Sequence, residues 1–504
     1  MIKGHPKGLI AASLANMGER FGFYTMMAIL VLFLQAKFGL DGKDAGLIYS
    51  TFYMLIYVLS LIGGIIADKT KNYKGTILAG LVVMGFGYVL MAYPSPINAS
   101  NQTTYLVFTC ISLFVIAFGN GLFKGNLQAL VGQMYDNEKY GKMRDSGFSL
   151  FYAFINIGAI FAPFIAVGVR NWWLGRSGFE YNANLPELCH GFIANPNNEG
   201  VAKFQELANQ VSGTTVTDLG AFATEYLNVF NTGFHYAFAT AIVAMGISLF
   251  IYIANKKKFP NPQTHTSSKD SGVSQVEMDP KEVKQRIYAL LAVFAVVIFF
   301  WFSFHQNGLT LTFFAKDYTL LKLGPWNLSA ETFQSMNPFF VVFLTPVIVA
   351  IFGWLRSRNI EPSTPKKIAI GMGIAASAYV LMTVVSYFSN LPLKADIVGN
   401  PLEEARLVTP FLLMGTYLIL TIAELFISPL GISFVSKVAP PKYQGIMQGL
   451  WLGATAAGNQ LLFIGAVLYE SVPIWLTWTV FVVACVISMF SMIFMLKWLE
   501  RVAK

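Results

Sequence analysis

The sequence predicts an all-α polytopic membrane protein with twelve transmembrane helices in two six-helix halves. Of its 504 residues, 55% are hydrophobic and only 12% are charged, whereas about 25% of residues are charged in soluble proteins. Apolar runs long enough to cross a hydrocarbon core of about 30 Å recur along the whole chain. One long polar segment separates the first six runs from the last six. Together these observations exclude a soluble globular protein.

Six apolar runs define an N-terminal half over residues 1–254. We expect transmembrane helices over residues 8–36, 45–67, 75–93, 105–131, 146–168 and 232–254. The first run is no cleaved signal peptide, because it is too long, contains Glu19 and Arg20 and lacks a small-residue cleavage site. Residues 169–231 form a long insertion between the fifth and sixth helices. We expect a small loop subdomain there, with a partner-binding surface as the alternative.

A polar linker over residues 255–286 leads to the C-terminal half over residues 287–504. No apolar run in this linker is long enough to cross a membrane. The second half is expected to contain helices over residues 287–314, 333–355, 366–388, 408–436, 446–469 and 474–497. Six helices plus six is the arrangement of the major facilitator superfamily, whose halves enclose a site near the bilayer midplane.

The positive charges follow the predicted topology. Most of the 35 Lys and Arg residues fall in segments on one side of the helices, for example Lys256 to Lys258 and Arg356. Cytoplasmic loops carry such an excess, so we place both termini in the cytoplasm and the chain in the plasma (inner) membrane. We see no nucleic-acid patch. The three scattered cysteines predict neither a disulfide framework nor a metal cluster, and we expect no cofactor.

Five ionisable side chains fall well inside predicted helices. They are Glu19, Arg20, Lys124, His305 and Glu424, and they come from the first, fourth, seventh and tenth helices. Such groups are costly in a bilayer and persist mainly where they face a wet cavity or a partner. We expect them to converge on one cavity, with structural ion pairs as the alternative. Because protonation of an acid releases a basic partner, the set also indicates proton coupling.

Polar and aromatic side chains accompany these charges inside the helices. The polar ones include Asn16, Asn156, Gln334 and Asn337, and the aromatic ones are Tyr24, Tyr57, Trp301 and Trp451. Each alone fits helix bridging or core packing. A pocket with charged ends and aromatic sides suits a zwitterion, of which a short peptide is the obvious example.

The first helix carries a stretch with a specific resemblance. Residues 16–24 read Asn-Met-Gly-Glu-Arg-Phe-Gly-Phe-Tyr, which resembles the motif Glu-x-x-Glu-Arg-Phe-x-Tyr-Tyr of the proton-dependent oligopeptide transporters. Further stretches that resemble this family lie at residues 63–68, 121–124, 151–159, 333–338, 424–431 and 449–451. They cover nearly the whole chain except the insertion and the linker.

The resemblance implies a proton-coupled symporter that imports di- and tripeptides by alternating access. It implies that Arg20 and Lys124 receive the peptide carboxylate and that Glu424 receives the amino group. Proton coupling falls to Glu19, His305 and Glu424. The remaining predicted substrate contacts are Tyr24, Tyr57, Asn156, Trp301, Gln306, Asn337, Ser428 and Trp451. The expected partners are a short peptide, protons and membrane lipid, with no obligate protein partner.

Several positions depart from the family motif. Asn16 occupies the first acidic position and cannot titrate, and Phe23 replaces a tyrosine. Met27 and His305 stand where many members have an arginine and an acid. The alternative is therefore a family member with atypical coupling or a non-peptide substrate, such as an anion, a modified peptide or an amino-acid conjugate. We expect no enzyme, because the chain has neither a His-Glu-x-x-His nor a Gly-x-Ser-x-Gly motif.

Overall fold

The computed structural model describes residues 4–96, 98, 100–260 and 278–503. Twelve helices in these residues are long and apolar enough to cross a membrane, as the sequence predicts. The first half contains α1 (Leu9–Phe38), α2 (Gly42–Thr70), α3 (Tyr73–Ala92), α4 (Gln102–Gln133), α5 (Arg144–Arg176) and α8 (Leu219–Asn255). Between α5 and α8 lie α6 (Leu185–Ala194) and α7 (Val201–Ser212).

The second half contains three membrane spans that are built from more than one helical segment. The six spans of this half are α9 (Pro280–Phe304) with η3 (His305–Gly308) and α10 (Thr310–Tyr318), η4 (Ala330–Ser335) with α11 (Met336–Ser357), α12 (Thr364–Phe388), α14 (Pro410–Val438), α15 (Gln444–Gln460) with α16 (Leu462–Ser471), and α17 (Ile474–Val502). The short elements are η1 (Gly141–Met143), η2 (Lys256–Lys258), α13 (Lys394–Ile397), η5 (Glu404–Arg406), η6 (Pro441–Tyr443) and the hairpin β1 (Lys322–Leu323) with β2 (Trp326–Asn327).

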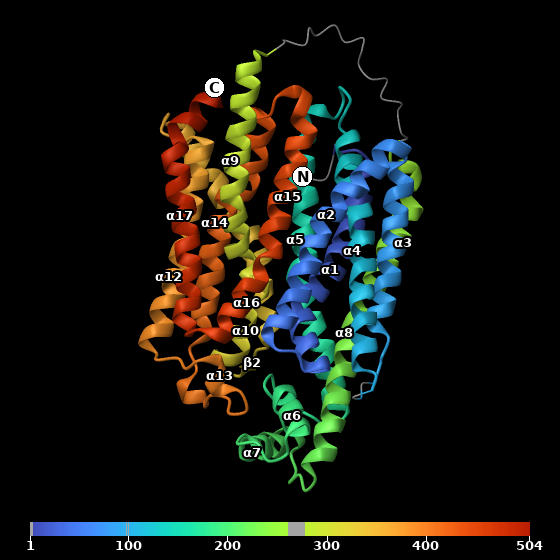
Figure 1. The fold of residues 1–504 in the computed structure, drawn as a ribbon. Helices are drawn as coiled ribbons and strands as arrows, with labels where there is room; N and C mark the ends of the chain where they lie inside the picture. The colour runs from blue at the N-terminus through green and yellow to red at the C-terminus, as the bar shows by residue number, and fades with distance from the viewer. Residues whose placement is uncertain (1–3, 97, 99, 261–277, 504) are drawn as a thin grey trace.

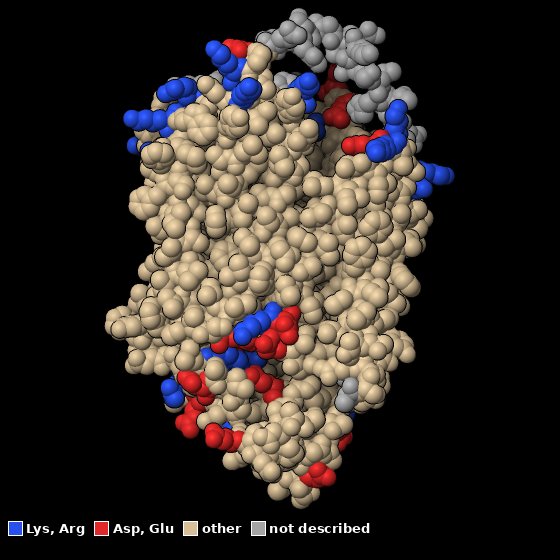
Figure 2. Space-filling model, viewed as in Figure 1, with Lys and Arg blue, Asp and Glu red and all other residues tan. Residues whose placement is uncertain are grey.

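The two halves lie side by side as two helix bundles (Figure 1). Both chain termini lie toward one end, here called the termini end, whereas α6 and α7 project from the opposite end, here called the insertion end (Figure 1). Figure 2 shows a broad belt of uncharged side chains around the middle of the molecule, with Lys and Arg gathered at the termini end. Such a belt is what a bilayer core requires.

Glycines allow the helices of the first half to approach closely. A side chain at Gly119 of α4 would lie 2.5 Å from the backbone nitrogen of Met84 in α3, closer than atoms can approach. Gly63 of α2 packs in the same way against the backbone of Gly121, and Asn126 donates a hydrogen bond of 3.0 Å to the Gly63 carbonyl. Small residues at such crossings are typical of membrane helices.

The seventh span is interrupted at its centre. The α-helix ends at Phe304, and Leu309 adopts φ −121° and ψ −86° before α10 begins. The carbonyls released by the break accept hydrogen bonds from tyrosines of other helices: Tyr379 donates to Ser303 and Tyr417 donates to Asn307 over 2.5 Å. A membrane protein tolerates a broken helix where neighbouring groups satisfy the backbone in this way. His305 is the first residue after α9 and therefore lies at the break in this span.

Two features differ from the sequence-based expectation. The fifth span continues to Arg176 and the sixth begins at Leu219, so the predicted 169–231 insertion is shorter and mainly helical. Arg170 lies in this longer fifth span, and its side chain is buried in an ion pair. At the other boundary, Asp218 caps α8 by accepting a hydrogen bond from Ala221. Most of the predicted linker, residues 261–277, lies outside the described residues.

Candidate functional site

The first helix brings an ion pair to the centre of the molecule. Arg20 donates hydrogen bonds to both carboxylate oxygens of Glu19, over 2.5 and 2.6 Å. Asn120 of α4 donates a third, over 2.7 Å. Both charged side chains are buried, and the Arg20 guanidinium also lies 4.7 Å from the Phe23 ring centroid. Glu19 is thus fully partnered within the first half, while Arg20 keeps an NH group that these bonds do not use.

Lys124 of α4 lies over an aromatic ring instead of pairing with an acid. Its Nζ is 4.3 Å from the ring centroid of Tyr57 in α2, a distance that gives a favourable cation–π contact. Tyr57 in turn interacts electrostatically with Tyr24, Arg20 and Glu424. Because Glu424 belongs to the second half, Tyr57 lies within electrostatic range of a cation of one half and the acid of the other.

Glu424 of α14 is held by neighbours within its own half. Asn337 of α11 donates a hydrogen bond of 2.8 Å to its carboxylate and a second of 3.1 Å to Thr421. The ion pairs found among the described residues do not join Lys124 to Glu424, so no ion pair between these two residues connects the halves in this conformation. Neither group is therefore occupied by the other.

His305 lies at the break in the seventh span. Its Nδ1 donates to Oδ1 of Asn459 over 2.5 Å, which leaves Nε2 as the nitrogen that can accept a proton. The ring stacks on Trp301 with centroids 4.9 Å apart and contacts Tyr53 of the first half at 4.7 Å. This histidine thus lies at the interface between the halves.

The other predicted substrate contacts have different surroundings in the structure. Trp451 packs its ring onto Gly431 of α14, where a side chain could not fit, and Asn156 donates to the Tyr152 carbonyl of its own helix. Ser428 is half-buried on α14. Gln306 is fully buried and bonds to the Leu462 carbonyl and to Thr310, both in the second half. These bonds explain Gln306 as a packing residue of the broken span.

Two buried charge clusters at the insertion end lie outside the residues predicted from the sequence. Arg170 of α5 pairs with Glu331 of η4, and both side chains are at most 1% exposed. Glu187 of α6 lies 3.3 Å from Lys316 and 3.1 Å from Lys394. Each contact joins the first half to the second. The signal for the first cluster was the apolar run that continues past Arg170, and nothing in the sequence marked Glu187.

Among the described residues, the hydrogen bonds and ion pairs that join the halves lie toward the insertion end, whereas α2 and α15 pack against each other closer to the termini end. Ser335 donates to the Ile160 carbonyl over 2.9 Å, and Gln334 donates to the Ala28 carbonyl over 3.3 Å. Glu470 accepts a bond from the Gly42 amide. At the termini end the surface is hollowed between the halves (Figure 2). These bonds join the halves on the insertion side of the central residues. The described residues contain no group of His, Cys, Asp or Glu able to hold a metal ion.

The chain matches a protein-family model and several curated relatives whose names describe transporters or permeases. The model, described as the POT family, matches residues 74–278 and 269–475. The chain is 28% identical to the "Uncharacterized transporter YclF" of Bacillus subtilis over 93% of this chain and 89% of that protein. It is 27% identical to the "Peptide transporter YePEPT" of Yersinia enterocolitica (90% and 86%) and 26% identical to the "Dipeptide and tripeptide permease A" of Proteus mirabilis (87% and 81%).

Solved structures share the same fold along the whole chain. A crystal structure titled peptide transporter POT in complex with sulfate superimposes with a TM-score of 0.73 at 23% identity, covering 100% of this chain and 96% of that one. A POT family transporter in complex with 5-aminolevulinic acid gives 0.71 at 21% identity, covering 100% and 98%. These matches establish the fold, and the named relatives are transporters, not enzymes. With the family model matching most of its length, the chain belongs to the POT family.

Proposed function

We propose that this protein is a proton-coupled symporter that imports di- and tripeptides by alternating access. The observation that carries the proposal is that Arg20 of the first half and Glu424 of the second both act electrostatically on Tyr57, over whose ring Lys124 lies. Fixed charges of opposite sign on two moving bodies suit a zwitterion, because each end of the solute binds a different half. Relatives named as dipeptide and tripeptide permeases support the substrate class.

Arg20 and Lys124 receive the peptide carboxylate, and Glu424 receives the amino group. Asn337 already donates to Glu424 and lies where it can exchange that bond for one to the peptide backbone, and Asn156 has the same role. Tyr24, Tyr57, Trp301, Trp451 and Ser428 line the side-chain space. Aromatic walls tolerate varied side chains, while the charged groups fix the orientation of the backbone.

Proton coupling is assigned to Glu19, His305 and Glu424. Protonation of Glu19 removes the charge that holds Arg20 in place, so the guanidinium becomes available to a carboxylate. The free Nε2 of His305 is a second acceptor at the interface between the halves. A proton on Glu19 changes its contact with Arg20, and a proton on His305 changes its contacts at the interface between the halves.

The termini end is proposed to face the cytoplasm, in the plasma (inner) membrane. Lys and Arg gather at this end (Figure 2), as positively charged loops do on the cytoplasmic side. The insertion end then faces outward, and the described contacts between the halves close the outer side. The conformation is accordingly inward-facing, with protons, a short peptide and lipid as its partners.

A second function within the same fold is transport of a non-peptide solute, or transport with atypical coupling. Asn16 favours it, because an amide at the first motif position cannot carry a proton. The fold is shared by a POT family transporter solved with 5-aminolevulinic acid, an amino acid and not a peptide. Its solutes would be an anion, a modified peptide or an amino-acid conjugate.

Uptake into liposomes under an imposed pH gradient tests both functions. A library of di- and tripeptides is compared with free alanine and with anionic solutes. We expect accumulation of peptides that collapses when the gradient is dissipated. Accumulation of an anion without peptide uptake would favour the second function, and peptide uptake that ignores the gradient would remove proton coupling.

A further inference from the structure

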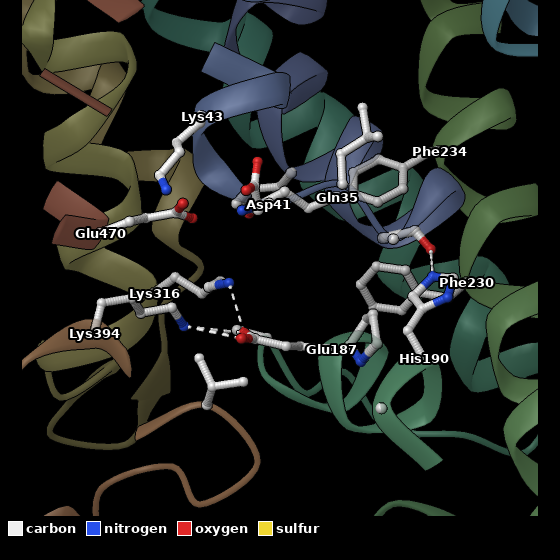
Figure 3. A pocket seen from close by; sticks show the side chains of 18 of the residues that line it. Gln35, Asp41, Lys43, Glu187, His190, Phe230, Phe234, Lys316, Lys394 and Glu470 are labelled. Atoms are coloured by element: carbon white, nitrogen blue, oxygen red, sulfur yellow. Dashed lines mark hydrogen bonds and ion pairs between the residues drawn. The ribbon is translucent and has the colours of Figure 1, made fainter. Parts of the chain in front are cut away.

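A cavity of about 470 Å³ lies at the insertion end, away from the central site. Side chains of both halves line it, among them Glu187 and His190 of α6, Lys316 of α10 and Lys394 of α13. Figure 3 shows Lys316 and Lys394 both pointing at the carboxylate of Glu187. Lys316 and Lys394 are called the lysine pair.

The lysine pair is built into the second half. The two lysines are each 7% exposed. Asp317, also buried, lies 3.2 Å from Lys394 and 3.5 Å from Lys316, and Tyr469 donates to its other oxygen over 3.1 Å. The two lysines and the one acid in contact with them, Asp317, carry a net positive charge of one. A second acid of this half, Glu470 of α16, also lines the cavity, but its carboxylate accepts a hydrogen bond from the Gly42 amide of the first half. A buried site of that kind requires an anion from elsewhere.

Glu187 supplies this anion from the first half. Its carboxylate oxygens lie 3.1 to 3.3 Å from both lysine nitrogens. Helix α6 is fixed to the first half, since His190 donates to the Ala36 carbonyl over 2.8 Å and Tyr226 bonds to the segment before α6. Glu187 is 31% exposed, unlike the lysines. A single half-buried carboxylate on a separate body therefore neutralises a preformed cationic site.

We propose that the lysine pair is a binding site for the carboxylate of a small solute, which Glu187 occupies as a tethered competitor. The cavity beside it is large enough for a ligand of dipeptide size. A solute carboxylate that displaces Glu187 also removes one of the contacts that join the halves at this end. The site is distinct from Arg20 and Lys124. Its place as the first stop on the uptake path rests on the proposed function.

The test places a fluorescent bimane on Val398→Cys, four residues beyond Lys394, in a Cys110→Ser background. Val398 lines the cavity and is 56% exposed, so it accepts the label, and Cys110 is the exposed one of the three native cysteines. The probes are N-acetyl-dialanine and its C-terminal amide, which differ in the carboxylate alone. A local fluorophore distinguishes this site from binding at the centre. Thermal unfolding of each full-length variant in detergent verifies that it is folded.

In Glu187→Gln we expect a saturable emission change with N-acetyl-dialanine and none with the amide. The wild-type chain should need a several-fold higher concentration, because Glu187 competes. Glu206→Gln, which removes an exposed carboxylate of α7, should match the wild type. Adding Lys316→Gln and Lys394→Gln to Glu187→Gln should abolish the response.

A folded Glu187→Gln variant that does not distinguish the carboxylate probe from the amide would overturn the proposal. A carboxylate response that survives loss of both lysines would do the same. Neither readout depends on transport. Failed peptide uptake with an intact response would refute the proposed function alone, whereas normal uptake without the response would refute this site alone.

Discussion

At the centre of the protein, the cations of one half and the acid of the other have different partners. Arg20 is occupied by Glu19, Lys124 lies over Tyr57, and Glu424 accepts from Asn337. A zwitterionic solute can replace the last two contacts at small cost, since neither is a buried ion pair. Lys124 and Glu424 are therefore the residues on which substrate binding depends most directly.

Lys124→Ala and Glu424→Ala should each abolish or severely weaken peptide uptake into liposomes. Each variant loses the charge that receives one end of the peptide. Lys497→Ala, which removes an exposed lysine of α17, serves as the control and should transport normally. Thermal unfolding separates lost binding from lost folding. Near-normal uptake by both variants would show that the solute binds elsewhere.

Glu19→Gln should lose accumulation driven by a pH gradient while it retains some exchange between equally loaded compartments. Glutamine keeps the shape of the side chain but cannot cycle a proton, so Arg20 can no longer be released by protonation. His305→Gln should shift the pH dependence of uptake less severely, because Asn459 already holds one ring nitrogen. Unchanged gradient-driven accumulation in Glu19→Gln would move the proton site to another residue.

The central charges could be predicted from the sequence, whereas their partners could not. An acid or base in an apolar run is easily recognised, because placing it in a bilayer costs free energy and therefore indicates a function. This rule identified Glu19, Lys124 and Glu424. The sequence contains no comparable sign that Asn120 bonds to Glu19 or that Lys124 lies over Tyr57. These contacts depend on how α1, α2 and α4 rotate against one another. The same limit applies to Gln306, which was predicted as a substrate contact although its amide is bonded inside the second half.

At the scale of elements, the insertion end depends on pairs that are distant in the chain. Glu187 lies 129 residues from Lys316 and 207 from Lys394. A polar segment with several acids gives no indication of which one is buried. The break in the seventh span had a better signal, since the polar run from His305 to Gly308 interrupts an apolar segment. The apolar residues on both sides of this run nevertheless led to the prediction of one helix over residues 287–314.

Arg170→Met should destabilise the protein by about 3–5 kcal/mol, because it leaves Glu331 as an unpaired buried charge. The double variant with Glu331→Met should recover much of that loss, since two apolar side chains can replace a buried ion pair. Chemical unfolding in detergent followed by tryptophan fluorescence measures both. Equal stability of the single and double variants would mean that the pair contributes through packing of Arg170 on Tyr181 and its aromatic neighbours.

The α6 contact should not respond to pH between about 8 and 6.5. Burial opposes ionisation of Glu187, but the charges of Lys316 and Lys394 outweigh it and hold the pKa of this carboxyl well below its usual value of 4.5. Burial also keeps the pKa of His190 below 6.5, so that ring stays neutral. Because the pKa of Glu187 is lowered in the closed contact, ionised Glu187 stabilises this contact fully at any pH above the usual carboxyl pKa. The stabilisation is lost only as the pH falls toward the lowered pKa.

Bimane at Val398→Cys measures this directly, with no solute present. We expect the same emission across that pH range, and a change only at more acidic pH. A transition near neutral pH would assign a proton switch to the insertion end. Under the expected outcome, proton coupling must come from the centre, where Glu19, His305 and Glu424 lie.

At the scale of the whole molecule, the hydrogen bonds and ion pairs that join the halves are unevenly distributed among the described residues. Hydrogen bonds from Gln334 and Ser335, the Arg170 ion pair and the Glu187 contact all lie toward the insertion end. Opening that end requires these contacts to break together. Rocking of two rigid halves about the central site accomplishes this with one motion. The sequence predicted the two halves, but not which end is closed.

Two cysteine reporters test this motion. Ala36→Cys lines the cavity at the insertion end and is 4% exposed, and Gln128→Cys lies one helical turn beyond Lys124 toward the termini end. In the conformation described here, a water-soluble maleimide should label Gln128→Cys quickly and Ala36→Cys slowly. Trp326→Cys, which is 68% exposed on the hairpin, should be labelled quickly under all conditions.

Substrate and pH gradient should move the two reporters in opposite directions, because one rigid motion opens one end as it closes the other. Adding dialanine, or weakening the closed end with Arg170→Met, should raise the labelling rate of Ala36→Cys and lower that of Gln128→Cys by a similar factor. All rates are compared at one labelling pH, so that thiol ionisation does not enter. If both reporters are labelled quickly under the same condition in a single homogeneous phase, the two ends are open together. The protein would then conduct its solute as a channel, and alternating access would be wrong.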